Sequence, residues 1–189
     1  MEKQLTHEQS LQIITEMIGN AKQNLAKGGS FYFLLWGMVV AIADFAIHYL
    51  INYTEVKQWY WIWLITIPAV ILTIVHARSS ASRAVITGPI DRLYGQIWIG
   101  VFIAMVITVV FMAEINYAVN PIMLIYSGIG TYITGRLSRF QPLIAGAVIL
   151  WGCAIVVFLI PVSYQFLMSG LGFIGGYVIP GLMLRKHEK

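Results

Sequence analysis

Two acidic side chains and one histidine stand out as candidates for chemistry in this mostly apolar sequence. Asp44 is the only acidic residue well inside a hydrophobic stretch, His48 follows it by one helical turn, and Glu114 ends another such stretch. A carboxylate beside an imidazole can relay protons, hold a zinc-like cation or activate water. We therefore predict Asp44, His48 and Glu114 as one binding site, and as the ligands if a metal is bound.

The same three residues also have a purely structural interpretation. Asp44 would then be hydrogen-bonded to a tyrosine, a threonine or the backbone, and His48 and Glu114 would face water at the membrane surface. The chain has no HExxH or GxSxG motif, so an enzyme is the less favoured class and no catalytic residue is predicted. The sequence leaves any cofactor unknown.

One hydrophobic stretch differs from the others because it is rich in glycine and hydroxyl groups. A polar helix is costly against lipid, and it is therefore expected to face the interior of a bundle. This stretch predicts a pore-lining or packing face formed by Ser127, Gly130, Thr131, Tyr132 and Thr134.

Length and composition identify the class of protein. The chain has 189 residues, of which 59% are hydrophobic and 11% charged, values outside the range of soluble globular domains. A helix needs roughly 20 apolar residues to cross a bilayer. We predict an all-α, polytopic integral membrane bundle of six transmembrane helices, at about residues 31–51, 59–77, 94–113, 119–135, 142–160 and 163–184.

The basic residues predict the orientation of these spans. When the connecting segments are assigned alternately to the two sides, Lys57 is the only one of the 12 lysines and arginines on the outer side. An excess of lysine and arginine marks the cytoplasmic loops of membrane proteins. We therefore expect a protein of the cell (inner or plasma) membrane with both termini in the cytoplasm.

The segment before the first span forms a separate unit in this prediction. Residues 1–28 carry apolar side chains at helical spacing, with polar side chains on the opposite side, and end at Gly28-Gly29. They predict an amphipathic helix that lies on the membrane surface, pairs with a second copy, or covers the ends of the bundle. The six-span domain then covers residues 29–189.

Partners and function follow only in outline. The net charge of +4 is explained by cytoplasmic anchoring residues, which favours anionic lipid headgroups as partners over nucleic acid; a homo-oligomer is compatible with the sequence. The favoured function is non-enzymatic binding or passage of a small solute, ion or lipid. A regulatory or scaffold subunit and an intramembrane metal-dependent enzyme are the alternatives.

Overall fold

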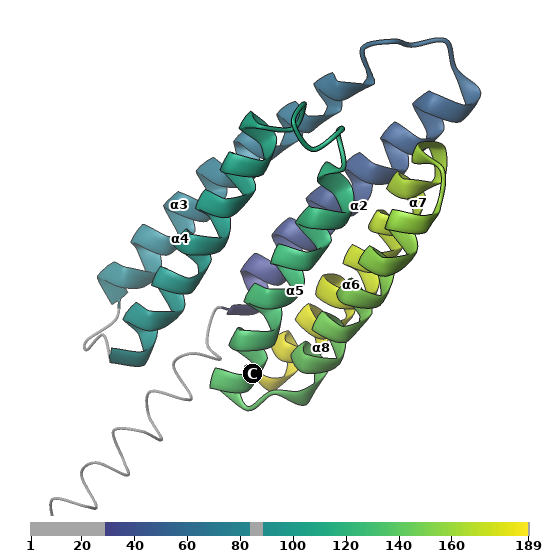
Figure 1. Cartoon of the computed structure of the whole chain (residues 1–189). Helices are drawn as coiled ribbons and strands as arrows, with labels where there is room; N and C mark the ends of the chain where they lie inside the picture. Colours follow the sequence, from purple (N-terminus) through teal and green to yellow (C-terminus); the bar gives the residue numbers. More distant parts are fainter. Residues whose placement is uncertain (1–28, 84–88, 189) are drawn as a thin grey trace, which may run out of the picture.

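The computed structural model describes residues 29–83 and 89–188, with side-chain surroundings for 29–79 and 93–188. The predicted amphipathic helix 1–28 lies outside the described residues. Every regular element in the described ranges is helical, as the sequence predicted (Figure 1). The elements are α2 (Gly29–Tyr53), the 3₁₀ segment η1 (Trp59–Ile65), α3 (Thr66–Arg83), α4 (Pro89–Val110), α5 (Val119–Ser138), α6 (Gln141–Leu159), α7 (Val162–Phe173), the π-helical segment η2 (Ile174–Val178) and α8 (Ile179–His187).

Five helical stretches in the described chain are long and apolar enough to cross a membrane: Gly29–Tyr53, Trp59–Ser79, Leu93–Val110, Gln141–Leu159 and Val162–His187. The last joins α7, η2 and α8 into one helix of 26 residues, here called the last span. The predicted span 119–135 corresponds to α5, which has the length but is not among the five. Its glycines and hydroxyl groups lower its hydropathy, and it runs against α6 along its length.

Two predicted boundaries need correction. The predicted span 94–113 ends earlier, because α4 stops at Val110 and residues 111–118 form turns with left-handed backbone at Asn116 and Tyr117. The predicted span 59–77 starts as the 3₁₀ segment η1, not as an α-helix. Pro68 explains the late start of α3, because it has no N–H to bond the carbonyl group one α-helical turn earlier.

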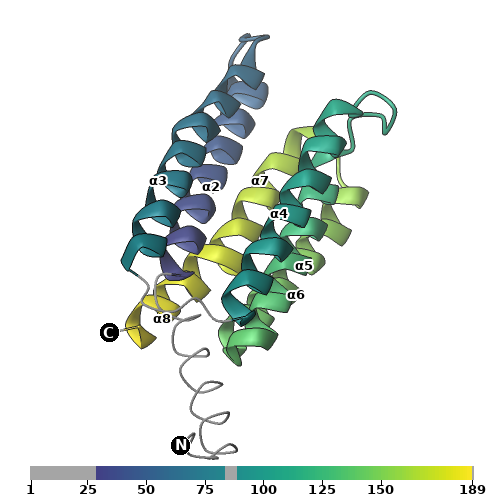
Figure 2. The same cartoon turned by 90° about the vertical axis from the view of Figure 1, so that its left-hand side faces the viewer.

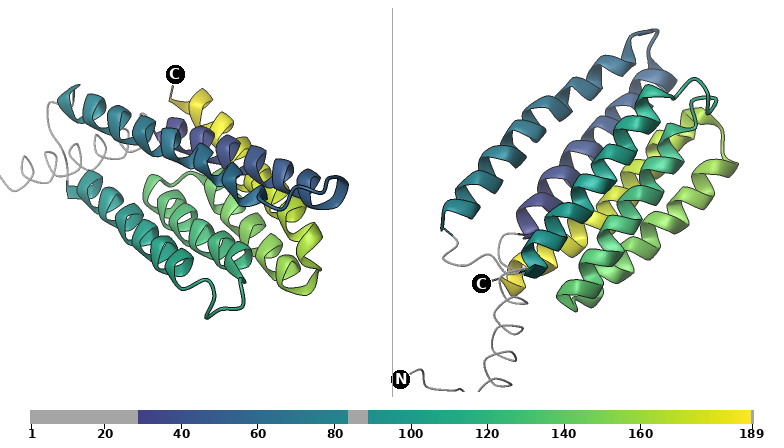
Figure 3. Two further views of the ribbon diagram at one scale, coloured as in Figure 1. Left: turned by 90° about the horizontal axis from the view of Figure 1, so that it is seen from above. Right: turned by 60° about the vertical axis from the view of Figure 1, so that its left-hand side comes forward.

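The helices form two layers joined along one side. One layer contains α2 and α3 and the other contains α4, α5 and α6, while the last span lies between α2 and α6 and packs against both (Figures 2 and 3). On the opposite side, α3 packs on α2 and η1, and α4 packs on α5, but α3 and α4 do not form a packed pair. The best-covered part of the bundle is thus built from α2, α5, α6 and the last span.

A tryptophan–threonine hydrogen bond ties each of the two outlying helices, α3 and α4, to its neighbour. The Trp36 indole donates to the Thr73 hydroxyl at 3.1 Å and joins α2 to α3, while the Trp98 indole donates to the Thr134 hydroxyl at 3.3 Å and joins α4 to α5. The two bonds span 37 and 36 residues. In a membrane, where no hydrophobic force draws helices together, such bonds help to fix helix pairs.

Glycine allows the last span to approach α6 at backbone distance. A methyl group on Gly146 would lie 2.5 Å from the carbonyl oxygen of Gly176. Pro180, four residues after Gly176, has no N–H to bond that carbonyl, and the π-helical turn η2 is formed at this place. Small residues at helix contacts are typical of membrane bundles.

This contact generates a paired prediction. Replacing Gly146 by alanine drives a methyl group into backbone that cannot rotate away, which we expect to destabilise the protein by about 1–3 kcal/mol. Gly152 is on the same helix and is exposed, and a methyl group added there would meet nothing within 4 Å. Apparent melting temperatures in detergent should fall for Gly146→Ala and hold or rise for Gly152→Ala. Equal melting temperatures would contradict the packing described.

The two ends of the described chain are joined by a cap. Ser30, at the start of α2, donates its backbone N–H to a carboxylate oxygen of Glu188 at 2.9 Å, and its hydroxyl donates to the other oxygen. An acceptor with negative charge at a helix N-terminus satisfies free N–H groups and complements the helix dipole. The residue that follows the last span thereby holds the start of α2 in place.

The cap gives a second stability prediction. Glu188→Ala removes both acceptors and should lower the unfolding free energy by about 1 kcal/mol. Glu188→Gln keeps one acceptor and should lose less. Glu55→Ala, an exposed carboxylate at the opposite end of the bundle, is the control and should be neutral. A Glu188→Ala protein as stable as the Glu55→Ala protein would show that the cap contributes nothing.

Candidate functional site in the bundle interior

Asp44 lies on the face of α2 that packs against the last span. The buried residues Phe33, Gly37, Ala41 and Asp44 recur at three- and four-residue spacing and form one stripe along this helix. Such spacing places side chains on a single helical face. Asp44 is 1% exposed, so its carboxyl group belongs to the interior of the bundle and not to its lipid-facing surface.

Close contacts establish which part of the last span is level with Asp44. Gly37 packs against Tyr177 and Val178, and Gly170 packs under the ring of Phe45, the neighbour of Asp44. The two helices therefore run antiparallel, and the Asp44 side chain is at the depth of residues 169–171. Ser169 is at this depth and is 1% exposed.

A third buried polar group comes from α5. Gly172 packs against Leu124 of α5, and farther along the same pair of helices the Tyr177 hydroxyl approaches Ser127 and Thr131. These contacts place Ser127 within about one helical turn of the depth of Asp44. Ser127 is also 1% exposed. Here the name interior oxygen cluster is used for Asp44, Ser127 and Ser169.

The oxygens of this cluster are buried without a well-formed hydrogen bond to any described residue. This holds for both carboxylate oxygens of Asp44 and for the hydroxyl oxygens of Ser127 and Ser169, although the Tyr177 hydroxyl lies near Ser127. In contrast, the Thr131 hydroxyl on the same helix as Ser127 donates to the Ser127 carbonyl at 2.7 Å. Buried polar groups in proteins are nearly always satisfied, and an exception calls for an explanation such as a bound ion or water.

Among the side chains that the structure describes, no basic group is buried with Asp44. In the part of the chain whose side chains are described, the buried polar residues besides Asp44 are serines and threonines. An isolated carboxylate at membrane depth is costly, so the group must either bind a proton or receive a cation from outside the protein.

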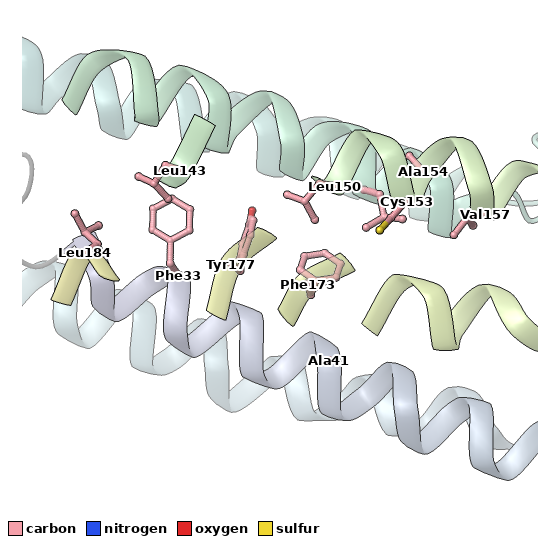
Figure 4. Close-up of a cluster of buried hydrophobic side chains, with 11 residues drawn as sticks. Phe33, Ala41, Leu143, Leu150, Cys153, Ala154, Val157, Phe173, Tyr177 and Leu184 are labelled. Atoms are coloured by element: carbon pink, nitrogen blue, oxygen red, sulfur yellow. The ribbon is translucent and has the colours of Figure 1, made fainter. Parts of the chain in front are cut away.

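Aromatic rings border the cluster on the side of Gly29 and Glu188, the ends of the described chain. Phe33 of α2 stands edge-on to Tyr177 with ring centres 5.2 Å apart, and Tyr177 in turn stands edge-on to Phe173 at 5.2 Å (Figure 4). Trp98 of α4 completes the group, with its ring centre 6.0 Å from that of Phe33. Figure 4 shows the rings of Phe33, Tyr177 and Phe173 in a row between α2 and α6.

His48 is not the partner of Asp44. Its Nδ1 atom is 2.7 Å from the carbonyl oxygen of Ser163, an acceptor, which assigns the ring proton to Nδ1. The Asn52 amide donates to the same carbonyl at 3.0 Å. Because Ser163 is in the first turn of α7, His48 and Asn52 anchor the beginning of the last span to the end of α2.

Glu114 is also separate from Asp44. It is exposed and lies in the turns after α4, whose main packing partner is α5. Across the described ranges 29–83 and 89–188, no three histidine, cysteine or acidic residues form a group able to hold a metal ion. The structure therefore does not bring Asp44, His48 and Glu114 together as the metal ligands that the sequence suggested.

The polar face predicted on α5 divides in the structure. Ser127, Gly130, Thr131 and Thr134 are buried, and Thr134 donates to the Gly130 carbonyl at 2.7 Å while accepting the bond from Trp98. Tyr132 lies on a different side, is 36% exposed and packs against the ring of Trp151. The buried members pack within the bundle, and among them only Ser127 has an unpartnered side-chain oxygen.

Ser169 and Tyr177 were missed by sequence reasoning. Ser169 is a serine in an apolar run and carries no signal by itself, because serine can satisfy its hydroxyl within its own helix. The Ser169 hydroxyl has no such partner, and its depth relative to Asp44 follows from contacts between helices that are far apart in the chain.

Comparison with protein-family models, curated proteins and solved structures finds no match to this chain.

Proposed function

We propose that this chain is a six-span protein of the cell membrane that binds or passes a small ion or solute at Asp44, with both termini on the cytoplasmic side. The observation that carries the proposal is the carboxyl group of Asp44, which is buried in the bundle with both oxygens unpartnered and no basic side chain among the described buried residues. Intramembrane acidic residues of this kind mark ion and solute pathways.

The distribution of charge supports the proposed orientation. The C-terminal ends of α3, α5 and α8 lie at the same end of the bundle (Figure 1), and they carry the exposed residues Arg78, Arg136, Arg185 and Lys186. Lys57 is at the opposite end, in the connection between α2 and η1. By the positive-inside rule, the arginine-rich end faces the cytoplasm, where these side chains contact anionic lipid headgroups.

Orientation is tested by single cysteines in a Cys153→Ala protein. Tyr117 is 69% exposed in the turns after α4, and Lys186 is exposed at the other end. In intact cells an impermeant thiol reagent should modify Tyr117→Cys and spare Lys186→Cys until the membrane is opened. Modification of Lys186→Cys in sealed cells would reverse the orientation, and modification of both would contradict the six-span arrangement.

A binding function requires that the site be reached from water. In the Cys153→Ala background, Asp44→Cys should react with the small water-soluble reagent 2-aminoethyl methanethiosulfonate, because a ligand and the reagent must use the same route. Val157→Cys is the matched control, since Val157 is fully buried on α6 among apolar core residues. The mass added to purified protein measures the reaction.

The expected result is clear modification of the Asp44→Cys protein under conditions that leave the Val157→Cys protein unmodified. Size-exclusion profiles that match the parent protein establish that both variants are folded. If the thiol of folded Asp44→Cys protein is as unreactive as that of Val157→Cys, Asp44 is a sealed structural residue and the proposed function is wrong.

A further inference from the structure

We propose that the interior oxygen cluster of Asp44, Ser127 and Ser169 is a binding site for a dehydrated alkali-metal cation of about the size of Na⁺. This proposal rests on the function proposed above and names the class of ligand. Three properties of the cluster lead to it, namely its charge, the chemical type of its unpartnered atoms and the room around them.

The charge of the site selects a monovalent cation. Asp44 brings one negative charge, and no basic or second acidic side chain is buried in the part of the chain whose side chains are described. One monovalent cation leaves the site neutral, whereas a divalent ion would leave an uncompensated positive charge in a medium of low dielectric constant. An anion would add to the charge of Asp44.

The unpartnered atoms are all oxygens. They are the two carboxylate oxygens of Asp44 and the hydroxyl oxygens of Ser127 and Ser169. Oxygen ligands suit hard cations, while the nitrogen and sulfur ligands favoured by transition metals are missing from this set. Protonation of Asp44 would remove its charge, whereas a cation keeps the carboxylate ionised and can also be coordinated by the serine hydroxyl oxygens nearest to it.

The room at the cluster excludes a bulky ligand. Asp44, Ser127 and Ser169 are each 1% exposed, so a water-sized sphere scarcely reaches their side chains. The neighbouring positions are filled as well, because Gly170 packs under Phe45 and Gly172 packs against Cys153 and Leu124. This crowding favours a bare cation over tetramethylammonium or a sugar.

The test is equilibrium binding of radioactive Na⁺ to the purified full-length protein in detergent, with choline as the balancing cation. The wild-type protein should bind about one Na⁺ per chain, and unlabelled Li⁺ or Na⁺ should compete while tetramethylammonium should not. Asp44→Asn, which has nearly the same shape, should abolish binding. Ser127→Ala and Ser169→Ala each remove one ligand and should raise the apparent Kd about tenfold.

Two control variants remove a carboxylate and a hydroxyl group outside the cluster. Glu114→Gln removes an exposed carboxylate, and Ser138→Ala removes a hydroxyl on α5 that is already bonded to the Thr134 carbonyl. Both should bind Na⁺ as the wild type does. Melting curves supply a second readout: Na⁺ should raise the melting temperature of the wild type and controls but not that of Asp44→Asn, because a ligand stabilises only the state that binds it.

The outcomes separate the two proposals. Unchanged Na⁺ binding by folded Asp44→Asn, or a wild-type protein that binds no alkali-metal ion, would overturn the cation site. If the water-soluble thiol reagent nevertheless modifies the Asp44→Cys protein, the binding function at Asp44 stands with another ligand. An unreactive Asp44→Cys protein would remove both proposals together.

Discussion

The close approach of the last span to α2 and α6 is the contact on which the rest of the structure depends. Gly37 and Gly170 let α2 and the last span meet, and Gly146 meets the carbonyl oxygen of Gly176 on the other side. Because van der Waals packing is the main attraction between helices in lipid, these positions determine where the last span lies. The depth of Ser169 beside Asp44 and that of Tyr177 beside Gly37 follow directly, and so does the position of the buried oxygens.

The bundle therefore combines a tightly packed part with an outlying part. The last span, α2, α5 and α6 supply most of the buried side chains, while α3 and α4 are largely exposed and each is tied to one neighbour by a tryptophan–threonine bond. The unpartnered oxygens lie in the packed part. Access to these oxygens therefore requires helices to move. The loosely covered helices α3 and α4 are expected to move more readily than the packed helices.

Some of this arrangement could be predicted from the sequence and some could not. The apolar stretches are helices, and the small residues around Asp44 do mark a buried face, because both properties depend on spacing within one helix. The partner of His48 depends on the depth at which α7 begins, and the early end of α4 leaves Glu114 exposed. Contacts between segments that are far apart in the chain determine these features, so the spacing of residues within one helix does not predict them.

Infrared difference spectroscopy of the Asp44 carboxyl group tests the central claim most directly. The spectrum of the purified protein is recorded while choline is exchanged for Na⁺, and the Asp44 signals are identified by their loss in Asp44→Asn. If Asp44 is a cation ligand, its carboxylate bands change on addition of Na⁺. The Ser127→Ala and Ser169→Ala proteins should then need a higher Na⁺ concentration for the same change. Carboxyl bands that are the same in choline and Na⁺ would show that this buried aspartate is structural.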